Sequence, residues 1–139
     1  MFSQTVEYAL RAIVHLARKP DKQQTVAQIA KATQVPAPYL SKVLQALARD
    51  GLVIVKRGVS GGFLLAKTPR EMTIFDVVQS VDPLQRIAAC PLALTSHRKQ
   101  LCSLHKKMDD ALAGIELVFR QTTLEELINS PNPSVPLCD

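Results

Sequence analysis

The stretch 25–67 constrains the fold of this chain more than any other part. Thr25 and Gln28 have the spacing of a capping box, in which each side chain satisfies a free backbone donor at the start of a helix. Apolar residues then recur at helical spacing until a proline interrupts them. Pro38 suits the first turn of a second helix, and Gly51 suits the left-handed position that ends it. The predicted inner face of the second helix consists of Leu40, Val43, Leu44 and Leu47.

Two short apolar runs follow the second helix and predict a hairpin. They are Leu52 to Val55 and Phe63 to Ala66, and the turn between them contains two glycines and is preceded by Lys56 and Arg57. Two helices joined by a short turn and followed by a basic two-stranded wing are the layout of a winged helix-turn-helix. We therefore expect a mainly α fold of this type with a two-stranded wing.

The side chains outside this core predict a nucleic-acid partner. The outer face of the second helix carries donors that suit phosphates and base edges. Lys56 and Arg57 place two charges on the wing, where a phosphate or a minor groove could lie. Each half alone is equally consistent with a solvated basic surface, but their order and lengths favour DNA binding. The predicted DNA contacts are Tyr39, Ser41, Lys42, Gln45, Arg49, Lys56 and Arg57.

Composition narrows the class of protein. The 139 residues suit one domain with a helical appendage, and the net charge of +5 favours an anionic partner. The apolar runs are too short to span a bilayer, and the first residues lack the features of a signal peptide, so we expect a cytoplasmic protein without a membrane partner. No phosphate-binding glycine loop supports catalysis. We therefore expect no enzyme and no small-molecule substrate.

A long helix with an apolar stripe is predicted from about residue 101 or 102 to Arg120. This stripe exceeds what one small domain needs, and we interpret it as a seam between two subunits. The alternative is a helix that folds back on its own domain. The stripe comprises Leu104, Met108, Ala111, Leu112, Ile115, Val118 and Phe119.

The chain divides into four predicted segments. Residues 1–83 form the winged helix-turn-helix domain, which begins with a helix over 3–18. Residues 84–101 lack a period and form a long loop, which is a candidate for function. Residues 102–130 contain the dimerisation helix and a short last helix, and 131–139 form a flexible tail.

Cys90, Cys102 and His105 are candidate metal ligands. Thiolate and imidazole bind iron–sulfur iron, zinc or copper(I). Cys102 and His105 are three residues apart at a helix start and point the same way. An odd number of cysteines, three in all, argues against a disulfide framework. Spacing alone also fits cysteines that serve as small buried apolar residues.

The chain resembles the family of small winged-helix regulators that includes IscR, NsrR and CymR. The stretches that carry the resemblance are VEYALRAIVHLA, VPAPYLSKVLQALARDGLV, KRGVSGGFLLAK, TIFDVVQSVD and TTLEELIN, which extend over nearly the whole chain. The resemblance implies a homodimer joined by the long helix, with one reader helix per subunit on a palindromic operator in double-stranded DNA.

The resemblance also implies a cofactor. Several members carry an iron–sulfur cluster on three loop cysteines, and Cys90 and Cys102 fall on the first and third of these. His105 falls on a histidine ligand of the [2Fe–2S] members. Ser96 stands at or near the place of the missing middle cysteine. Glu7 matches a first-helix acidic residue that ligates the cluster across the dimer in some members, although an exposed helix charge is the ordinary interpretation.

These observations predict a regulator, expected to be a repressor, that is switched by a labile [2Fe–2S] cluster sensing redox state, nitric oxide or iron–sulfur status. The ligands would be Cys90, Cys102 and His105, with Glu7 from the partner subunit. The alternative is the same DNA-binding regulator without a cluster, switched by thiol oxidation, zinc or a protein partner. His97 would complete a tetrahedral zinc set with the first three residues. Cys138 matches no family position.

Overall fold

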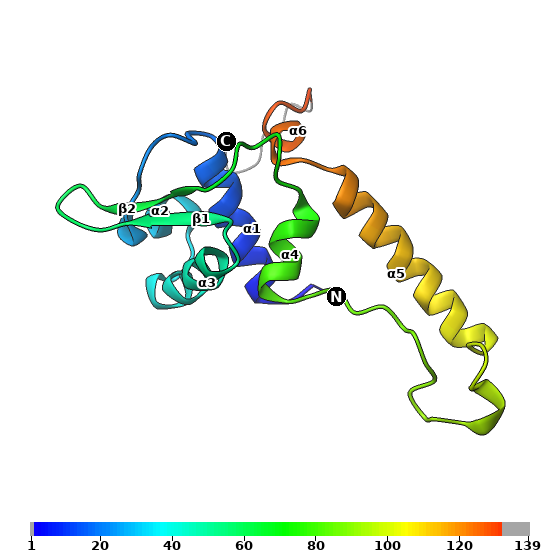
Figure 1. Ribbon diagram of the computed structural model, residues 1–139. Helices are drawn as coiled ribbons and strands as arrows, with labels where there is room; N and C mark the ends of the chain where they lie inside the picture. Colours follow the sequence, from blue (N-terminus) through cyan, green and yellow to red (C-terminus); the bar gives the residue numbers. More distant parts are fainter. Residues whose placement is uncertain (1, 132–139) are drawn as a thin grey trace.

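The structure is a computed structural model that describes residues 2–131. Cys138 and the predicted tail, apart from Pro131, lie outside the described residues. The elements follow the order expected for a winged helix-turn-helix with a long helix after it (Figure 1). They are α1 (Gln4–Ala17), α2 (Val26–Thr33), α3 (Ala37–Arg49), β1 (Val53–Lys56), β2 (Gly62–Leu65), α4 (Ile74–Val81), the 3₁₀ turn η1 (Thr95–His97), α5 (Ser103–Gln121) and α6 (Leu124–Ile128).

Local side chains set where the helices begin. The capping box predicted at Thr25 and Gln28 is present, with both of its hydrogen bonds formed. The same arrangement begins α4 at Thr73 and α6 at Thr123. Gly51 follows α3 with a φ of 74°, in the left-handed region that favours glycine. The sequence signals for the helix ends are therefore confirmed.

The core is built around α1. Ala9, Ala12, Ile13 and Leu16 are fully buried on this helix, which packs against α2, α3, α4 and α6. The small alanines allow neighbouring helices to approach closely. The four residues predicted to line the inner face of α3 are all buried. Together these contacts hold the second helix of the helix-turn-helix against the centre of the domain.

The last short helix, α6, closes the core from the far end of the chain. Leu124 is fully buried in the main core, and a bridge pairs Thr73 with Thr123. By packing, α6 joins the winged body, which we define as α1 to α4, β1, β2 and α6. The segment limits drawn from the sequence remain a prediction.

The wing is an antiparallel hairpin of β1 and β2, each displaced by one residue from its predicted run. Two backbone hydrogen bonds between Gln24 and Phe63, of 3.0 and 2.7 Å, tie β2 near the turn to the segment before α2. At its tip the Gly61 amide donates to the Gly58 carbonyl at 3.0 Å. A Cβ on Gly61 would lie 2.4 Å from the Lys56 carbonyl oxygen, so only glycine fits this turn. The hairpin therefore has a defined direction.

The loop 84–101 and α5 form an arm that extends away from the winged body (Figure 1). None of the residues of α5 is buried, although the helix contacts α4. Leu104 is 63% exposed and Met108 is 48% exposed. The helix thus leaves part of its apolar stripe uncovered by its own domain. None of the described helices is long and apolar enough to cross a membrane.

Candidate nucleic-acid interface and cysteine loop

The outer face of α3 presents the predicted reader residues to solvent. Lys42, Gln45 and Arg49 are exposed, and Ser41 is half-buried. Tyr39 is 45% exposed, and its ring packs edge-on against Tyr8 with ring centres 5.5 Å apart. This contact with α1 orients the Tyr39 ring at the start of the reader helix.

The cations of this surface have no carboxylate partners within residues 2–131. Lys56 and Arg57 are exposed at the end of β1 and in the wing turn. Among the described residues, no ion pair involves these two side chains or Lys42 and Arg49. A phosphate would meet these charges without displacing an internal partner. We call α3 and the wing, with the seven predicted contacts, the DNA-reading surface.

The arm is tied together by an ion cluster that centres on Arg86. Its guanidinium donates to both carboxylate oxygens of Asp109, at 2.7 and 2.8 Å, and to Glu116 at 3.2 Å. The Ile87 amide donates to the same Asp109 carboxylate at 2.9 Å. The start of the loop is therefore fastened along one side of α5.

The cluster also reaches the winged body. Arg120 donates to Glu116 at 2.9 Å, and its guanidinium lies 3.7 Å from the ring centre of Phe75 on α4. The hydrogen bonds from Arg86 hold the pKa of Asp109 at about 2, below its usual value. Those from Arg120 and then Arg86 lower the pKa of Glu116. Both carboxylates therefore stay charged at neutral pH.

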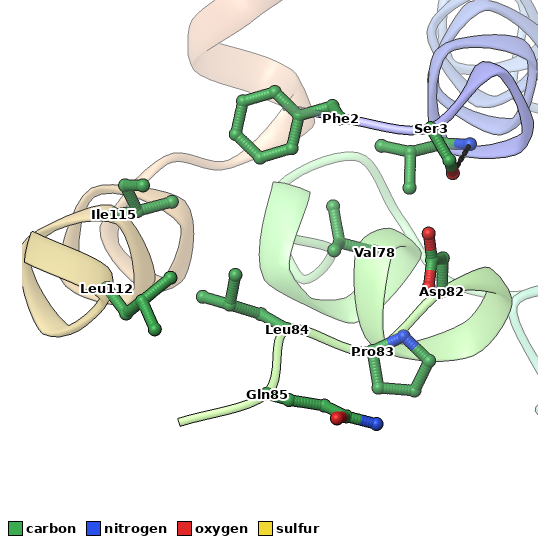
Figure 2. Close-up of a pocket in the computed structure, with 10 residues that line it drawn as sticks. Phe2, Ser3, Val78, Asp82, Pro83, Leu84, Gln85, Leu112 and Ile115 are labelled. Atoms are coloured by element: carbon green, nitrogen blue, oxygen red, sulfur yellow. Dashed lines mark hydrogen bonds between the residues drawn. The ribbon is translucent and has the colours of Figure 1, made fainter. Parts of the chain in front are cut away.

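A cavity of about 320 Å³ lies between α5 and the winged body (Figure 2). Leu112 and Ile115 of α5 face Leu84 and Val78 across it, and Phe2 covers one end. Leu112 and Ile115 of the apolar stripe therefore face the winged body of their own chain. The remaining large residues of the stripe, Leu104, Met108 and Val118, are exposed.

Cys102 and His105 form one contact pair at the start of α5. The thiol sulfur lies 3.2 Å from Nδ1 of the imidazole. Cys102 is the N-cap residue of α5, so the helix geometry turns both side chains to the same side, as predicted. Both side chains are partly exposed.

Cys90 and His97 form a second pair in the loop. Hydrogen bonds from the Leu94 backbone, then from the His97 side chain, lower the pKa of the Cys90 thiol to about 7. The turn between them places Ala93 at a φ of 52° and joins the Ala93 amide to the Cys90 carbonyl at 3.0 Å. Nδ1 of His97 is buried and has no hydrogen-bond partner among the described residues.

Glu7 lies apart from both pairs, on α1. Its carboxylate accepts from Arg11 at 2.9 Å, one helical turn away, and the side chain is largely exposed. Within the described residues, no three histidine, cysteine, aspartate or glutamate side chains meet in a geometry for a metal ion. One chain therefore presents the predicted ligands as two pairs and a separate carboxylate.

Sequence reasoning missed the Arg86 cluster. A signal existed, because Asp109 and Glu116 are seven residues apart and so share one side of a helix. Their partner Arg86 lies in the loop 84–101, where no repeating pattern predicts the position of a side chain. The environment of His97 carried no sequence signal, since it results from the path of the loop.

Comparison with known proteins shows what the chain is similar to. The profile of the Rrf2 family, described as iron-dependent transcriptional regulators, matches residues 2–130. A protein of Aquifex aeolicus, named as an HTH-type transcriptional regulator, is 35% identical over 93% of this chain and 92% of its own length. The regulator NsrR of Halalkalibacterium halodurans is 31% identical, over 89% of this chain and 87% of its own.

Solved structures share the fold. CymR, the global cysteine regulator of B. subtilis, superposes with a TM-score of 0.76 at 22% identity, over 91% of this chain and 95% of its own. IscR of T. potens superposes with a TM-score of 0.75 at 22% identity, over 91% of this chain and 84% of its own. At these identities the likeness shows the winged-helix fold.

Proposed function

The chain belongs to the Rrf2 family of transcriptional regulators, and from that premise we propose that it binds its operator as a homodimer under the control of a labile [2Fe–2S] cluster in the loop 84–101. Its relatives are named as regulators of transcription, which agrees with the prediction that it is not an enzyme. The fold implies DNA binding.

The observation that carries the proposal is the DNA-reading surface. Its cations have no partners among the described residues, and they occupy both the reader helix and the wing. In this arrangement Gln45 would reach a base edge, whereas Lys56 and Arg57 would contact the backbone or the minor groove. Backbone hydrogen bonds tie β2 to Gln24 and close the wing turn at Gly58, which supports a defined direction for the charges of the wing.

The exposed stripe of α5 supports the homodimer. Leu104, Met108, Ala111, Ile115 and Val118 recur at alternating intervals of four and three residues, the pattern of a two-helix seam. Large apolar side chains on this face remain in solvent in a single chain. A second copy of the same helix would cover them and would place two reader helices on one palindromic site.

The proposed cluster ligands are Cys90, Cys102 and His105, with Glu7 of the partner subunit as the fourth ligand. The donor set fits, because thiolate and imidazole are soft ligands suited to iron–sulfur iron. When bound, the cluster supplies iron that reacts with oxidants or nitric oxide. The residues of the loop would hold the arm in one arrangement when they are ligated.

Contacts on the arm support a link from the loop to the reader helix. Arg86 joins the loop to α5, and Arg120 joins α5 to Phe75 of α4. The Ser80 hydroxyl of α4 lies 3.5 Å from the Ala46 carbonyl oxygen of α3, in hydrogen-bonding geometry. A change in the loop would thus reach α3 through two packed helices.

One observation favours a second candidate, in which thiol oxidation switches the same regulator without a cluster. The pKa of about 7 makes a large share of Cys90 thiolate at neutral pH, and the thiolate is the form that oxidants attack.

Anaerobic purification and reconstitution with iron and sulfide tests the proposal. We expect visible absorption and bound iron in the wild type, and loss of both in Cys90→Ala and Cys102→Ala. Operator binding should differ between the loaded and the cluster-free protein. If the reconstituted wild-type protein stays colourless but still binds DNA, control by a cluster is wrong and control by thiol oxidation is favoured.

A further inference from the structure

Gln24, in the segment between α1 and α2, holds the wing against the winged body. Its side chain is buried, and its backbone amide and carbonyl both pair with Phe63 of β2, at 3.0 and 2.7 Å. A Cβ on Gly62 would lie 2.5 Å from the Gln24 carbonyl oxygen, so the two backbones lie in direct contact. In the hairpin, Phe63 and Gly62 pair with Val55 and Lys56. Gln24 therefore supports the wing beside its cations.

His15, in the last turn of α1, holds the side chain of Gln24. Its Nε2 lies 2.6 Å from Oε1 of Gln24. An amide oxygen only accepts hydrogen bonds, so the imidazole is the donor. Leaving a buried amide oxygen without a donor is unfavourable, so loss of the imidazole would force the Gln24 side chain to move. The position of Gln24, and through its backbone that of the wing, therefore depends on His15.

Tyr8, also on α1, makes the corresponding contact with the reader helix. Its ring meets that of Tyr39 edge-on, with ring centres 5.5 Å apart and ring planes at 77°. The Tyr8 hydroxyl accepts a hydrogen bond from Gln4 at 2.7 Å, and the Arg11 guanidinium lies 5.7 Å from the Tyr8 ring centre. The Tyr8 ring is thus held on its own helix, and it fixes the direction from which Tyr39 is supported.

The two contacts come from one side of one helix. Tyr8 and His15 are seven residues apart, which places them on the same face of α1. The fully buried Ala9, Ala12 and Ile13 hold this helix in the core. The helix packs against both α3 and β2 (Figure 1). One face of α1 therefore supports both parts of the DNA-reading surface.

We propose that Tyr8 and His15 are positioning residues for DNA binding, which set the reader helix and the wing in one fixed arrangement. Tyr8 acts through Tyr39, and His15 acts through Gln24 on Lys56 of the wing. Neither residue contacts DNA itself. The inference rests on the DNA binding of the proposed function and is independent of any cluster.

A fixed arrangement matters because the duplex presents its phosphates and grooves at set spacings. The reader helix and the wing can bind together only when their separation matches these spacings. A surface that already has the bound arrangement avoids ordering on binding and keeps more of its interaction energy. A loosened wing would keep its charges but would have to be ordered on DNA, so the affinity would fall.

The experiment is a pair of double-mutant cycles on metal-free, full-length protein. Tyr8→Leu and His15→Leu keep apolar volume but remove the aromatic edge and the donor. Each is combined with Tyr39→Ala and, separately, with Lys56→Gln plus Arg57→Gln. Affinity is measured by fluorescence anisotropy on a duplex selected from random sequences by the wild type. Circular dichroism confirms that each variant is folded at the assay temperature.

The proposal predicts a crossed pattern of coupling. His15→Leu should weaken binding about tenfold in the wild type and in Tyr39→Ala, but should have no effect once the wing is neutral, because contacting residues couple and independent ones add. Tyr8→Leu should show the reverse, with its effect lost in Tyr39→Ala. The conservative variants His15→Gln, which keeps a donor, and Tyr8→Phe, which keeps the ring, should bind as the wild type does.

Each other outcome contradicts a separate statement. Equal losses in all backgrounds would show that Tyr8 and His15 act through general stability, and unchanged affinity would show that they do not act on binding; either result overturns the positioning roles. A wild type that selects no duplex overturns these roles together with the proposed function. A protein that shows the crossed pattern but takes up no cluster on reconstitution would remove the cluster and leave the positioning roles in place.

Discussion

At the scale of the residue, exposure without a partner distinguishes side chains that act on a ligand from those that hold the fold. Lys56 and Arg57 are exposed and unpaired within the described residues, whereas Lys106 pairs with Asp110 at 3.2 Å. His15 contacts Gln24 at 2.6 Å beneath the wing and has a structural role. Two predictions follow from single side chains.

Neutralising both wing cations, Lys56→Gln with Arg57→Gln, should weaken binding to every duplex sequence. Each lost phosphate contact releases about one counterion fewer, so the slope of log affinity against log salt should fall in magnitude by roughly two per subunit. Fluorescence anisotropy over a salt series measures this slope. The control, Lys106→Gln with Lys107→Gln, changes the charge equally on the arm and should leave the slope unchanged. An unaltered slope in the wing variant would remove the wing from the set of phosphate contacts.

Cys90 should react with iodoacetamide with a midpoint near pH 7 in metal-free protein that has Cys102 and Cys138 replaced by serine. Because the folded-state pKa is lowered, the reactive thiolate is populated above about pH 7 and lost below it. His97→Ala should move the midpoint upward, since the imidazole is one cause of the shift. A midpoint at the usual cysteine value in the parent protein would contradict the prediction.

At the scale of the element, α5 combines two functions on different sides. One side carries Asp109, Glu116 and Arg120, which tie the arm together, and another presents the apolar stripe. The wing is an element of a different kind, because its turn depends on glycine rather than on side-chain packing. A prediction for each element separates its role from general stability.

Met108→Asp should convert dimers to monomers. Met108 is 48% exposed in one chain, so the substitution does not disturb the fold of the monomer, but in a seam it would bury a charge at a cost of several kcal/mol. Leu117→Asp is the matched control, because Leu117 is 54% exposed on another side of the same helix. Light scattering at several concentrations gives the mass. A stable dimer of Met108→Asp would place the interface elsewhere.

Gly61→Ala should weaken operator binding by distorting the wing. The added Cβ would lie 2.4 Å from the Lys56 carbonyl oxygen and 2.9 Å from that of Gly58, both backbone atoms, so the turn must shift. The core does not include this turn, and the thermal midpoint should change little. Ser60→Ala, one residue away, should bind normally. Equal affinity for Gly61→Ala and the wild type would show that the direction of the wing is unimportant.

At the scale of the whole molecule, the arm connects the loop 84–101, which contains Cys90, to the reader helix α3. The connection runs through several contacts, because no single side chain spans the distance. The fastening point is Arg86, which binds Asp109 through both carboxylate oxygens. If this ion pair transmits the state of the loop to α3, its loss should reduce the response of DNA binding to the loop. The DNA affinity itself and the chemistry of the loop should stay unchanged.

Arg86→Gln should leave DNA affinity of the metal-free protein unchanged and reduce its response to the state of the loop. It should also raise the pKa of Asp109 from about 2 toward its usual value of 3.8, because the hydrogen bond from the guanidinium is the largest cause of the lowered pKa. Since the folded-state pKa is lowered, this pair contributes stability that is fully present above the unfolded pKa and is lost as the pH falls toward about 2. Carboxyl NMR titration measures the pKa. An unshifted Asp109 would show that another group holds it.

The sequence by itself determined the winged body, because its signals are local. The capping residues Thr25 and Gln28, the left-handed Gly51 and the apolar period of α3 each act within a few residues, and the structure reproduces them. The reader side chains follow from the same period, since burying one face of a helix exposes the other. Their contacts with DNA remain predictions.

Only the tertiary structure decided what the arm looks like. A period in the sequence shows that α5 has an apolar face but not whether its own domain covers that face, because this depends on where the chain leaves α4. Likewise the sequence lists Cys90, His97, Cys102 and His105 without their pairing. The loop has no repeating pattern, so its path, the burial of the His97 nitrogen and the attachment of Arg86 result from contacts between residues distant in sequence.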